Sequence, residues 1–126
     1  MKSKVLVIDD EAHVAEALAM VLCIFGYDVR TENSGTDGLA QAALFHPDIV
    51  ICDVMMPVVN GVDTVIQIDQ QLPGRRIFLI SAVPEFAVRL MAERGMPEAF
   101  QVLPKPIAPR DLLYLLGCDG NIAATG

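Results

Sequence analysis

The stretch DIVICDVMMPVVNG, residues 48–61, places a single acidic residue, Asp53, at the end of a run of apolar side chains. A short, continuous apolar run is typical of a strand that is buried on both faces. Asn60 and Gly61 would favour a hairpin elsewhere, but helical periodicity follows them, so we predict a turn into a helix. The stretch therefore predicts a buried strand that ends at the Asp53 carboxylate, followed by a loop and a helix.

Apolar runs and helical patterns alternate along the rest of the chain. The predicted strands cover 5–8, 27–31, 48–52, 77–80 and 100–103, and the predicted helices cover 14–25, 34 onward, 62–72, 84–94 and 109–116. Strands that alternate with helices form a parallel sheet with helices on both faces, joined by right-handed crossovers. We therefore predict a single α/β domain with a flavodoxin-like, doubly wound, five-stranded parallel sheet in the order 2-1-3-4-5.

The composition argues against several classes of function. The 126 residues are enough for one domain with a substantial core. Sixteen acidic and nine basic residues give a formal net charge of −7, so we expect no direct binding to nucleic acid. No apolar run approaches the roughly 18 residues of a membrane span, and the N-terminal residues do not resemble a signal peptide, so we expect a cytoplasmic protein without membrane contact. Cys23, Cys52 and Cys118 lack zinc-site spacing, and we expect them to be small buried residues.

Four of the predicted strands end in polar or charged side chains: Asp9, Asp10 and Glu11 after the first strand, Asp53 after the third, Ser81 after the fourth and Lys105 after the fifth. Each residue alone has an ordinary explanation, because strand ends meet water and short polar side chains favour the starts of helices. The carboxyl ends of parallel strands meet at one edge of a sheet, however. We therefore expect these residues to share one site, beside the switch point of the sheet.

Carboxylates that share one crevice repel one another, and a hard divalent cation relieves the repulsion. Mg2+ prefers oxygen ligands and retains several waters. The predicted ligands are the carboxylates of Asp10 and Asp53 directly, Asp9 through water, and the backbone carbonyl of Met55. An aspartate beside such a metal can attack phosphorus and form an acyl phosphate. The Lys105 ammonium and the Ser81 hydroxyl would then face the phosphoryl oxygens.

These residues and their surroundings resemble the receiver domain of two-component response regulators. The matching segments are VLVIDDE (5–11), DIVICDVMMPVVNG (48–61), FLISA (78–82) and LPKPI (103–107). The resemblance extends over about residues 4–116. It implies a receiver domain at 1–116. The residues that follow, 117–126, are rich in Gly, Asp and Asn, so we expect them to form a flexible C-terminal tail.

The resemblance also implies a function. Asp53 would accept a phosphoryl group from a histidine kinase or a histidine phosphotransferase in a Mg2+-dependent reaction, with no enzymatic activity beyond this phosphotransfer and a slow dephosphorylation. Ser81 and the loop before Lys105 would then rearrange, and the face of the fourth helix, fifth strand and fifth helix would change its protein partners in a phosphorelay. A cis peptide bond between Lys105 and Pro106 is implied as well.

The sequence departs from the family pattern near this face. The family has an aromatic residue three positions before the lysine, where this chain has Val102, and Phe100, on the same side of the strand, is the candidate substitute. The segment 95–99 is longer than the usual turn, and Ala108 replaces the usual cap of the last helix. The absence of an aromatic residue at Val102 leaves a second interpretation open, a degenerate receiver that acts as a phosphorylation-independent interaction module.

Two apolar residues flank the predicted phosphoryl site. Met55 lies two positions after Asp53, and Val83 lies two positions after Ser81. Neither side chain can orient an attacking water. We therefore predict slow self-dephosphorylation.

Two other functions on related sheets fit the sequence less well. A phosphatase of the haloacid dehalogenase type needs Asp-x-Asp after the first strand, where this chain has Asp-Asp-Glu. A flavodoxin needs a phosphate-binding loop there, and carboxylates would repel the phosphate. We expect no metal-binding role for His13 or His46. The sequence leaves open the cognate kinase, the output, a weak homodimer, and whether the domain acts alone or within a longer chain.

Overall fold

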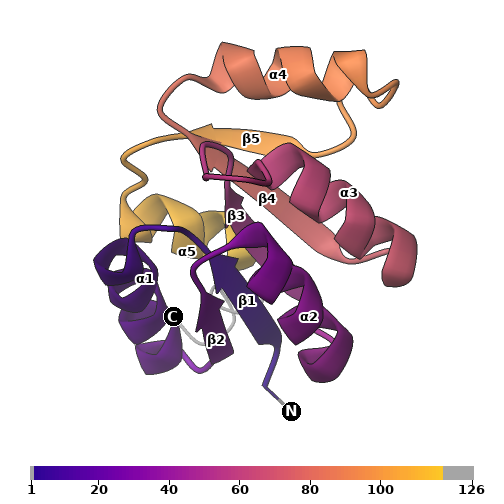
Figure 1. Ribbon diagram of the computed structural model, residues 1–126. Helices are drawn as coiled ribbons and strands as arrows, with labels where there is room; N and C mark the ends of the chain where they lie inside the picture. Colours follow the sequence, from indigo (N-terminus) through magenta and orange to yellow (C-terminus); the bar gives the residue numbers. More distant parts are fainter. Residues whose placement is uncertain (1, 118–126) are drawn as a thin grey trace.

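The computed structural model describes residues 2–117, which form a five-stranded parallel sheet with helices on both sides (Figure 1). The strands are β1 (Lys4–Ile8), β2 (Asp28–Glu32), β3 (Ile49–Asp53), β4 (Arg76–Ser81) and β5 (Gln101–Pro104). The helices are α1 (Ala12–Ile24), α2 (Gly35–Phe45), α3 (Gly61–Gln71), α4 (Pro84–Glu93) and α5 (Pro109–Gly117). The strand order β2-β1-β3-β4-β5 confirms the predicted fold. The predicted bounds differ from these by at most two residues, apart from the end of α2, for which no bound is predicted.

Alternate residues of the central strands pack on opposite faces of the sheet, because successive side chains of a strand point in opposite directions. On one face, α1 and α5 cover Val5, Val7, Ile49, Ile51, Phe78 and Ile80. On the other face, α2, α3 and α4 cover Leu6, Ile8, Val50, Cys52, Ile77 and Leu79. The central strands are therefore buried on both faces, as their continuous apolar sequences predict.

Short polar side chains begin two of the helices. The Ser34 Oγ accepts a hydrogen bond from the Asp37 N–H at 3.0 Å and begins α2. The Asn60 Oδ1 accepts one from the Asp63 N–H at 2.9 Å and begins α3. Each bond satisfies a donor that the first turn of a helix leaves without a partner. The second bond confirms that Asn60 and Gly61 lead into a helix rather than a hairpin.

Two expectations for α1 were wrong. The buried positions of this helix are Ala15, Leu18 and Leu22, and Cys23 is exposed because it lies one residue beyond that stripe. Phe25 was expected to be the last residue of this helix, but it is the C-cap residue and is 51% exposed. Cys52 is buried as expected, and Cys118 lies outside the described residues.

The C-terminal half contains several unusual backbone features around β5. Pro104 ends β5, an edge strand, where the missing N–H costs no ladder bond to a further strand. In the long loop before β5, Gly95 and Glu98 adopt left-handed backbone conformations. The peptide bond between Lys105 and Pro106 is cis, as the resemblance implies. The expected C-terminal tail lies outside the described residues except for Gly117, the last residue of α5.

None of the helices formed by residues 2–117 has both the length and the apolar content needed to cross a membrane.

Candidate functional site

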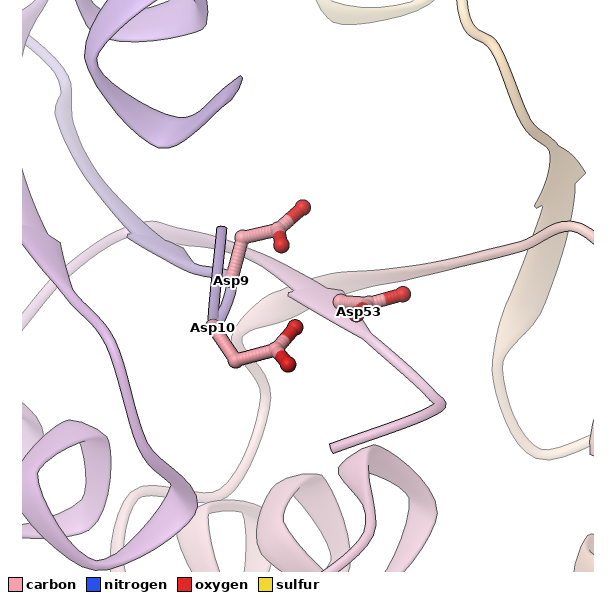
Figure 2. Close-up of side chains that lie close together, drawn as sticks. All are labelled: Asp9, Asp10 and Asp53. Carbon is pink, nitrogen blue, oxygen red and sulfur yellow. The ribbon is translucent and has the colours of Figure 1, made fainter. Parts of the chain in front are cut away.

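The carboxyl edge of the sheet brings three aspartates together. Ile8 of β1 pairs with Cys52 of β3, so the residues that follow them, Asp9 and Asp53, are neighbours across the switch point. One carboxylate oxygen from each of Asp9, Asp10 and Asp53 lies within 4.8 Å of the other two. Figure 2 shows the three carboxylates side by side at the ends of β1 and β3, pointing in the same general direction. Asp9 and Asp53 are buried, whereas Asp10 is exposed.

Lys105 supplies the positive charge of this cluster. Its Nζ lies 3.1 Å from the Asp9 Oδ2, 3.3 Å from the Asp53 Oδ1 and 3.5 Å from the Glu11 Oε1. The lysine follows β5, and its backbone N–H donates to the carbonyl oxygen of Ser81 at 2.8 Å. This backbone hydrogen bond holds Lys105 at the same edge of the sheet as the aspartates.

The surroundings raise the pKa values of Asp53 and Lys105. Burial, together with the negative charge of Asp9, raises the pKa of Asp53 to about 6, although Lys105 partly opposes the shift. Burial disfavours the Lys105 ammonium, but its hydrogen bond to Asp9 and the charges of Asp53 and Asp9 raise the pKa of this lysine overall. The cluster thus holds a charged lysine against carboxylates that repel one another.

The donor set fits Mg2+. The carboxylates of Asp9, Asp10 and Asp53 outnumber the one close ammonium, so negative charge remains without compensation. The Asp9 Oδ1 accepts the Glu11 N–H at 3.0 Å. The Asp9 Oδ2 is buried, and the Lys105 Nζ at 3.1 Å is its close polar neighbour among the described residues. Such an all-oxygen site, open to water on the Asp10 side, matches the preferences of a hard divalent cation.

A cavity of about 420 Å3 adjoins Asp10, the exposed member of the three aspartates. Its lining includes Asp10, the Met55 and Met56 residues that follow Asp53, Asn60 at the start of α3, and Phe86 of α4. Met55, the predicted carbonyl ligand, therefore lies at the same cavity as the Asp10 carboxylate. The cavity provides space for water or a small ligand beside Asp10 and the loop that follows Asp53.

Ser81 ends β4 beside this cluster and is fully buried. Its Oγ accepts a hydrogen bond from the Val83 N–H at 3.0 Å, which leaves the hydroxyl proton free to donate elsewhere. Ser81 pairs with Pro104 in the sheet, directly before Lys105. Val83 and Met55 are both about half exposed, at 49% and 55%.

Backbone packing holds Asp53 in place. Gly61 lies against the Asp53 carbonyl so closely that a Cβ on Gly61 would overlap with it. The Gly61 N–H also donates to the Val54 carbonyl at 2.8 Å. The buried Cys52 Sγ donates a hydrogen bond to the carbonyl oxygen of Asp53 at 3.3 Å. Burial, followed by the charges of Asp53 and Asp9, raises the pKa of this thiol. The thiol therefore stays protonated and acts as a buried donor.

Sequence reasoning missed one residue of the site. The Asn33 Nδ2 donates to the Asp9 carbonyl at 2.9 Å and holds the end of β1. Because β2 pairs with β1 up to Glu32, a polar residue just after β2 was a detectable candidate. His13 is exposed, and His46 is the left-handed C-cap of α2. Neither histidine belongs to the cluster of candidate metal ligands found among residues 2–117.

The raised pKa of Asp53 predicts that Asp53→Asn stabilises the metal-free protein at pH 7.5. A carboxyl with a raised folded-state pKa holds its proton longer in the folded state, so its contribution to stability falls as pH rises from about 4 to 6. Above that range, the variant should be more stable than wild type by about 2 to 3 kcal/mol. Below pH 4 the difference should vanish.

Chemical denaturation in EDTA across this pH range measures the effect. Asp28→Asn, which removes an exposed carboxylate at the opposite edge of the sheet, serves as the control. Equal stability of wild type and Asp53→Asn at pH 7.5 would show that the charge of Asp53 is already compensated.

Comparison with known proteins places the chain in a family. Residues 5–116 match the family model of the response regulator receiver domain. The chain is 34% identical over 113 residues to the alkaline phosphatase synthesis transcriptional regulatory protein PhoP of Bacillus subtilis, and the match covers 89% of this chain and 46% of PhoP. It is 33% identical over 115 residues to the DNA-binding response regulator MtrA of Mycobacterium tuberculosis, covering 90% and 48%. The chain thus spans about half the length of these curated relatives.

Solved structures of receiver domains resemble this chain as well. The chemotaxis protein CheY4 of Vibrio cholerae superposes with a TM-score of 0.80 at 29% identity, over 92% of this chain and 97% of CheY4. A CheY-like receiver domain protein from Methanospirillum hungatei gives a TM-score of 0.83 at 18% identity, over 98% and 99%, which shows the shared fold. With the family match over most of its length, the chain belongs to the receiver domain family of two-component response regulators.

Proposed function

We propose that this receiver domain accepts a phosphoryl group on Asp53 from a phosphohistidine of a histidine kinase or histidine phosphotransferase. The observation that carries the proposal is the cluster itself. Three aspartates lie within ligand distance of one another, and the Lys105 Nζ is 3.3 Å from an Asp53 oxygen. A structural ion pair needs neither the third carboxylate nor the buried Ser81 hydroxyl beside it.

In the transfer, an Asp53 oxygen attacks phosphorus, a P–O bond forms, and the P–N bond of the donor breaks. The leaving imidazole keeps the electron pair and takes up a proton. Lys105 faces both Asp9 and Asp53, so its charge is positioned to neutralise the incoming phosphoryl oxygens. The Ser81 hydroxyl, whose oxygen is already fixed by Val83, is free to donate to one of them.

Mg2+ is the proposed cofactor, and it would neutralise charge on the phosphoryl oxygens. Asp10 and Asp53 would bind it directly, with the Met55 carbonyl, and Asp9 would act through water. The bond from the Glu11 N–H supports this role for Asp9, because one of its two oxygens is already occupied. Phosphorylation would add about −1.5 to −2 charges to the site and shift the population of two conformations.

The partners are proposed from the same chemistry. A cytoplasmic histidine kinase or phosphotransferase would supply the phosphoryl group, and the face of α4, β5 and α5 would pass the signal to an output domain or partner protein in a phosphorelay. The curated relatives are named as transcriptional or DNA-binding regulators. We propose no direct nucleic-acid contact by the acidic domain itself and no turnover of a separate substrate; a weak homodimer is the proposed self-association.

Incubation with acetyl phosphate and Mg2+, followed by intact-mass measurement, tests the proposal. Wild type should gain the mass of one phosphoryl group, and Asp53→Asn should gain none. In a second arm, beryllofluoride with Mg2+ should shift the amide NMR signals of wild type only. Modification of Asp53→Asn to the same extent as wild type would refute Asp53 as the acceptor. Absence of any modification or shift in wild type would support the degenerate receiver instead.

Met55 and Val83 make the phosphorylated state long-lived. Both side chains are exposed beside the site, and neither can hydrogen-bond a water in line with the phosphorus. Met55→Asn and Val83→Glu should each shorten the half-life of the aspartyl phosphate by about tenfold, since positioned acid–base groups contribute at least about 100-fold where geometry is ideal. Decay after removal of the donor, followed by mass, gives the half-lives.

Val88→Glu is the matched control for these two variants, because Val88 is also a half-exposed apolar residue, on α4. It should decay like wild type. Identical decay of all four proteins would show that these two positions do not control hydrolysis.

A further inference from the structure

Arg94 connects the C-terminal end of α4 to the first turn of α3. The Arg94 Nε lies 2.7 Å from the Asp63 Oδ1, and the Nη2 lies 3.0 Å from the Oδ2. Both oxygens of the carboxylate are therefore engaged by the planar guanidinium. This two-point geometry fixes direction as well as distance, which a single-point surface ion pair does not.

Asp63 is in turn bonded to the residue that begins α3. The Asn60 Nδ2 donates to the Asp63 Oδ2 at 2.9 Å, and the Asp63 N–H donates back to the Asn60 Oδ1 at 2.9 Å. The Thr64 Oγ1 donates to the Asn60 carbonyl at 2.9 Å. The hydrogen bond from Arg94, the largest influence, lowers the pKa of Asp63, so this carboxylate is charged at neutral pH. Asn60 is thus held on three sides.

Asn60 also lines the cavity at the aspartate cluster, together with Asp10 and Met55. The segment from Met55 to Asn60 is short, and at its end Gly61 lies against the Asp53 carbonyl. A displacement of Asn60 therefore reaches both the proposed carbonyl ligand and the backbone of the proposed phosphoacceptor. The side chains of Asp63 and Asn60 connect Arg94 to this cavity.

We propose that Asn60, Asp63 and Arg94 form a link that couples α4 to occupancy of the Asp53 site. Binding of Mg2+ and a phosphoryl group would adjust the loop that ends at Asn60, and the Asp63–Arg94 pair would transmit the adjustment to α4. The link rests on the proposed function. It supplies a connection on the α3 side of the sheet.

Coupling between two sites is reciprocal, so the link makes two predictions. Loss of the two hydrogen bonds from Arg94 to Asp63 should weaken the binding of beryllofluoride with Mg2+. Conversely, binding of beryllofluoride should change the environment of the Arg94 side chain. Couplings of this kind typically amount to about three- to tenfold in affinity. An ion pair that only stabilises the fold would change neither quantity.

The experiment compares wild type with Arg94→Ala, Arg94→Lys, Asp63→Asn and the double variant Asp63→Asn/Arg94→Ala. Arg89→Ala is the matched control, because Arg89 is an exposed arginine of the same helix that makes no hydrogen bond or ion pair with the described residues. NMR titration gives the affinity for beryllofluoride at fixed Mg2+, and the Nε–H signal of Arg94 is followed in wild type. Thermal unfolding confirms that each variant is folded at the titration temperature.

We expect Arg94→Ala and Asp63→Asn to bind beryllofluoride about three- to tenfold more weakly, and the double variant to lose no more than either single variant. Arg94→Lys keeps the positive charge but cannot make both hydrogen bonds to Asp63. Its affinity for beryllofluoride should therefore be closer to that of Arg94→Ala than to that of wild type. Arg89→Ala should match wild type, and the Arg94 Nε–H signal should shift on binding.

Wild-type affinity in Arg94→Ala, with an unmoved Arg94 signal, would overturn the link while leaving the proposed function intact. Failure of wild type to bind beryllofluoride at all would overturn the proposed function and the link with it. Additive losses in the double variant would show that Asp63 and Arg94 act separately, which also contradicts the link.

Discussion

Gly61→Ala should destabilise the domain by about 3 kcal/mol and slow phosphorylation of Asp53 by roughly 100-fold. The added Cβ would overlap with the Asp53 carbonyl and would also lie close to the Cα of Val54. These are backbone atoms of buried residues at the end of β3 and directly after it, so they cannot rotate away as a flexible side chain would. The end of β3 must shift instead, and the carboxylate of Asp53 shifts with it.

Chemical denaturation and the rate of modification by acetyl phosphate measure the two effects on Gly61→Ala. Gly95→Ala separates the overlap from ordinary backbone strain. Gly95 has a φ of +73°, and a Cβ added to it would meet nothing within 4 Å, so its variant should lose about 1 to 2 kcal/mol and keep the phosphorylation rate. A fully active Gly61→Ala would mean that the end of β3 can move without displacing the carboxylate.

Lys105→Met should slow phosphorylation by about 100- to 1,000-fold while Mg2+ still binds. The Lys105 Nζ is the one cation within 4 Å of both Asp9 and Asp53 among the described residues. Without it, the incoming phosphoryl oxygens would meet carboxylates that only the metal neutralises. The pKa of Asp53 should rise above its value of about 6, because Lys105 is the group that lowers it. Mg2+ affinity should be unchanged or tighter, since a competing positive charge is gone.

The phosphorylation rate at saturating Mg2+ and the Mg2+ affinity from NMR titration test this separation of roles. Lys2→Met removes an exposed lysine before β1 and should behave like wild type in both measurements. A Lys105→Met variant that is phosphorylated within about threefold of wild type would show that the metal alone supplies the compensation. A parallel loss of Mg2+ binding would instead indicate that Lys105 organises the whole cluster.

The fold could be predicted almost completely from the sequence, because each central strand is a continuous apolar run and each break carries a turn or capping residue. The grouping of Asp9, Asp53 and Lys105 followed from topology alone, since parallel strands end at the same edge. The burial of α1 was harder to predict. Its sequence is apolar on nearly every side, so periodicity could not distinguish the exposed Cys23 and Phe25 from the buried Leu22.

Contacts between distant polar side chains were beyond the sequence. Asn33 reaches the Asp9 carbonyl across 24 positions, and Arg94 reaches Asp63 across 31. Neither pair has a spacing that belongs to a single helix or strand. Such contacts depend on how the helices are placed against the sheet, which a hydrophobic pattern specifies only to within a turn of a helix.

The buried thiol of Cys52 has a practical consequence for following the domain in solution. It is inaccessible to solvent and directly precedes Asp53, whereas Cys23 is exposed on α1. An alkylating reagent should therefore label Cys23 in the native protein and reach Cys52 only when the centre of the sheet opens. Peptide mapping of the two labels over time gives an opening rate beside Asp53, with Cys23 as the internal reference.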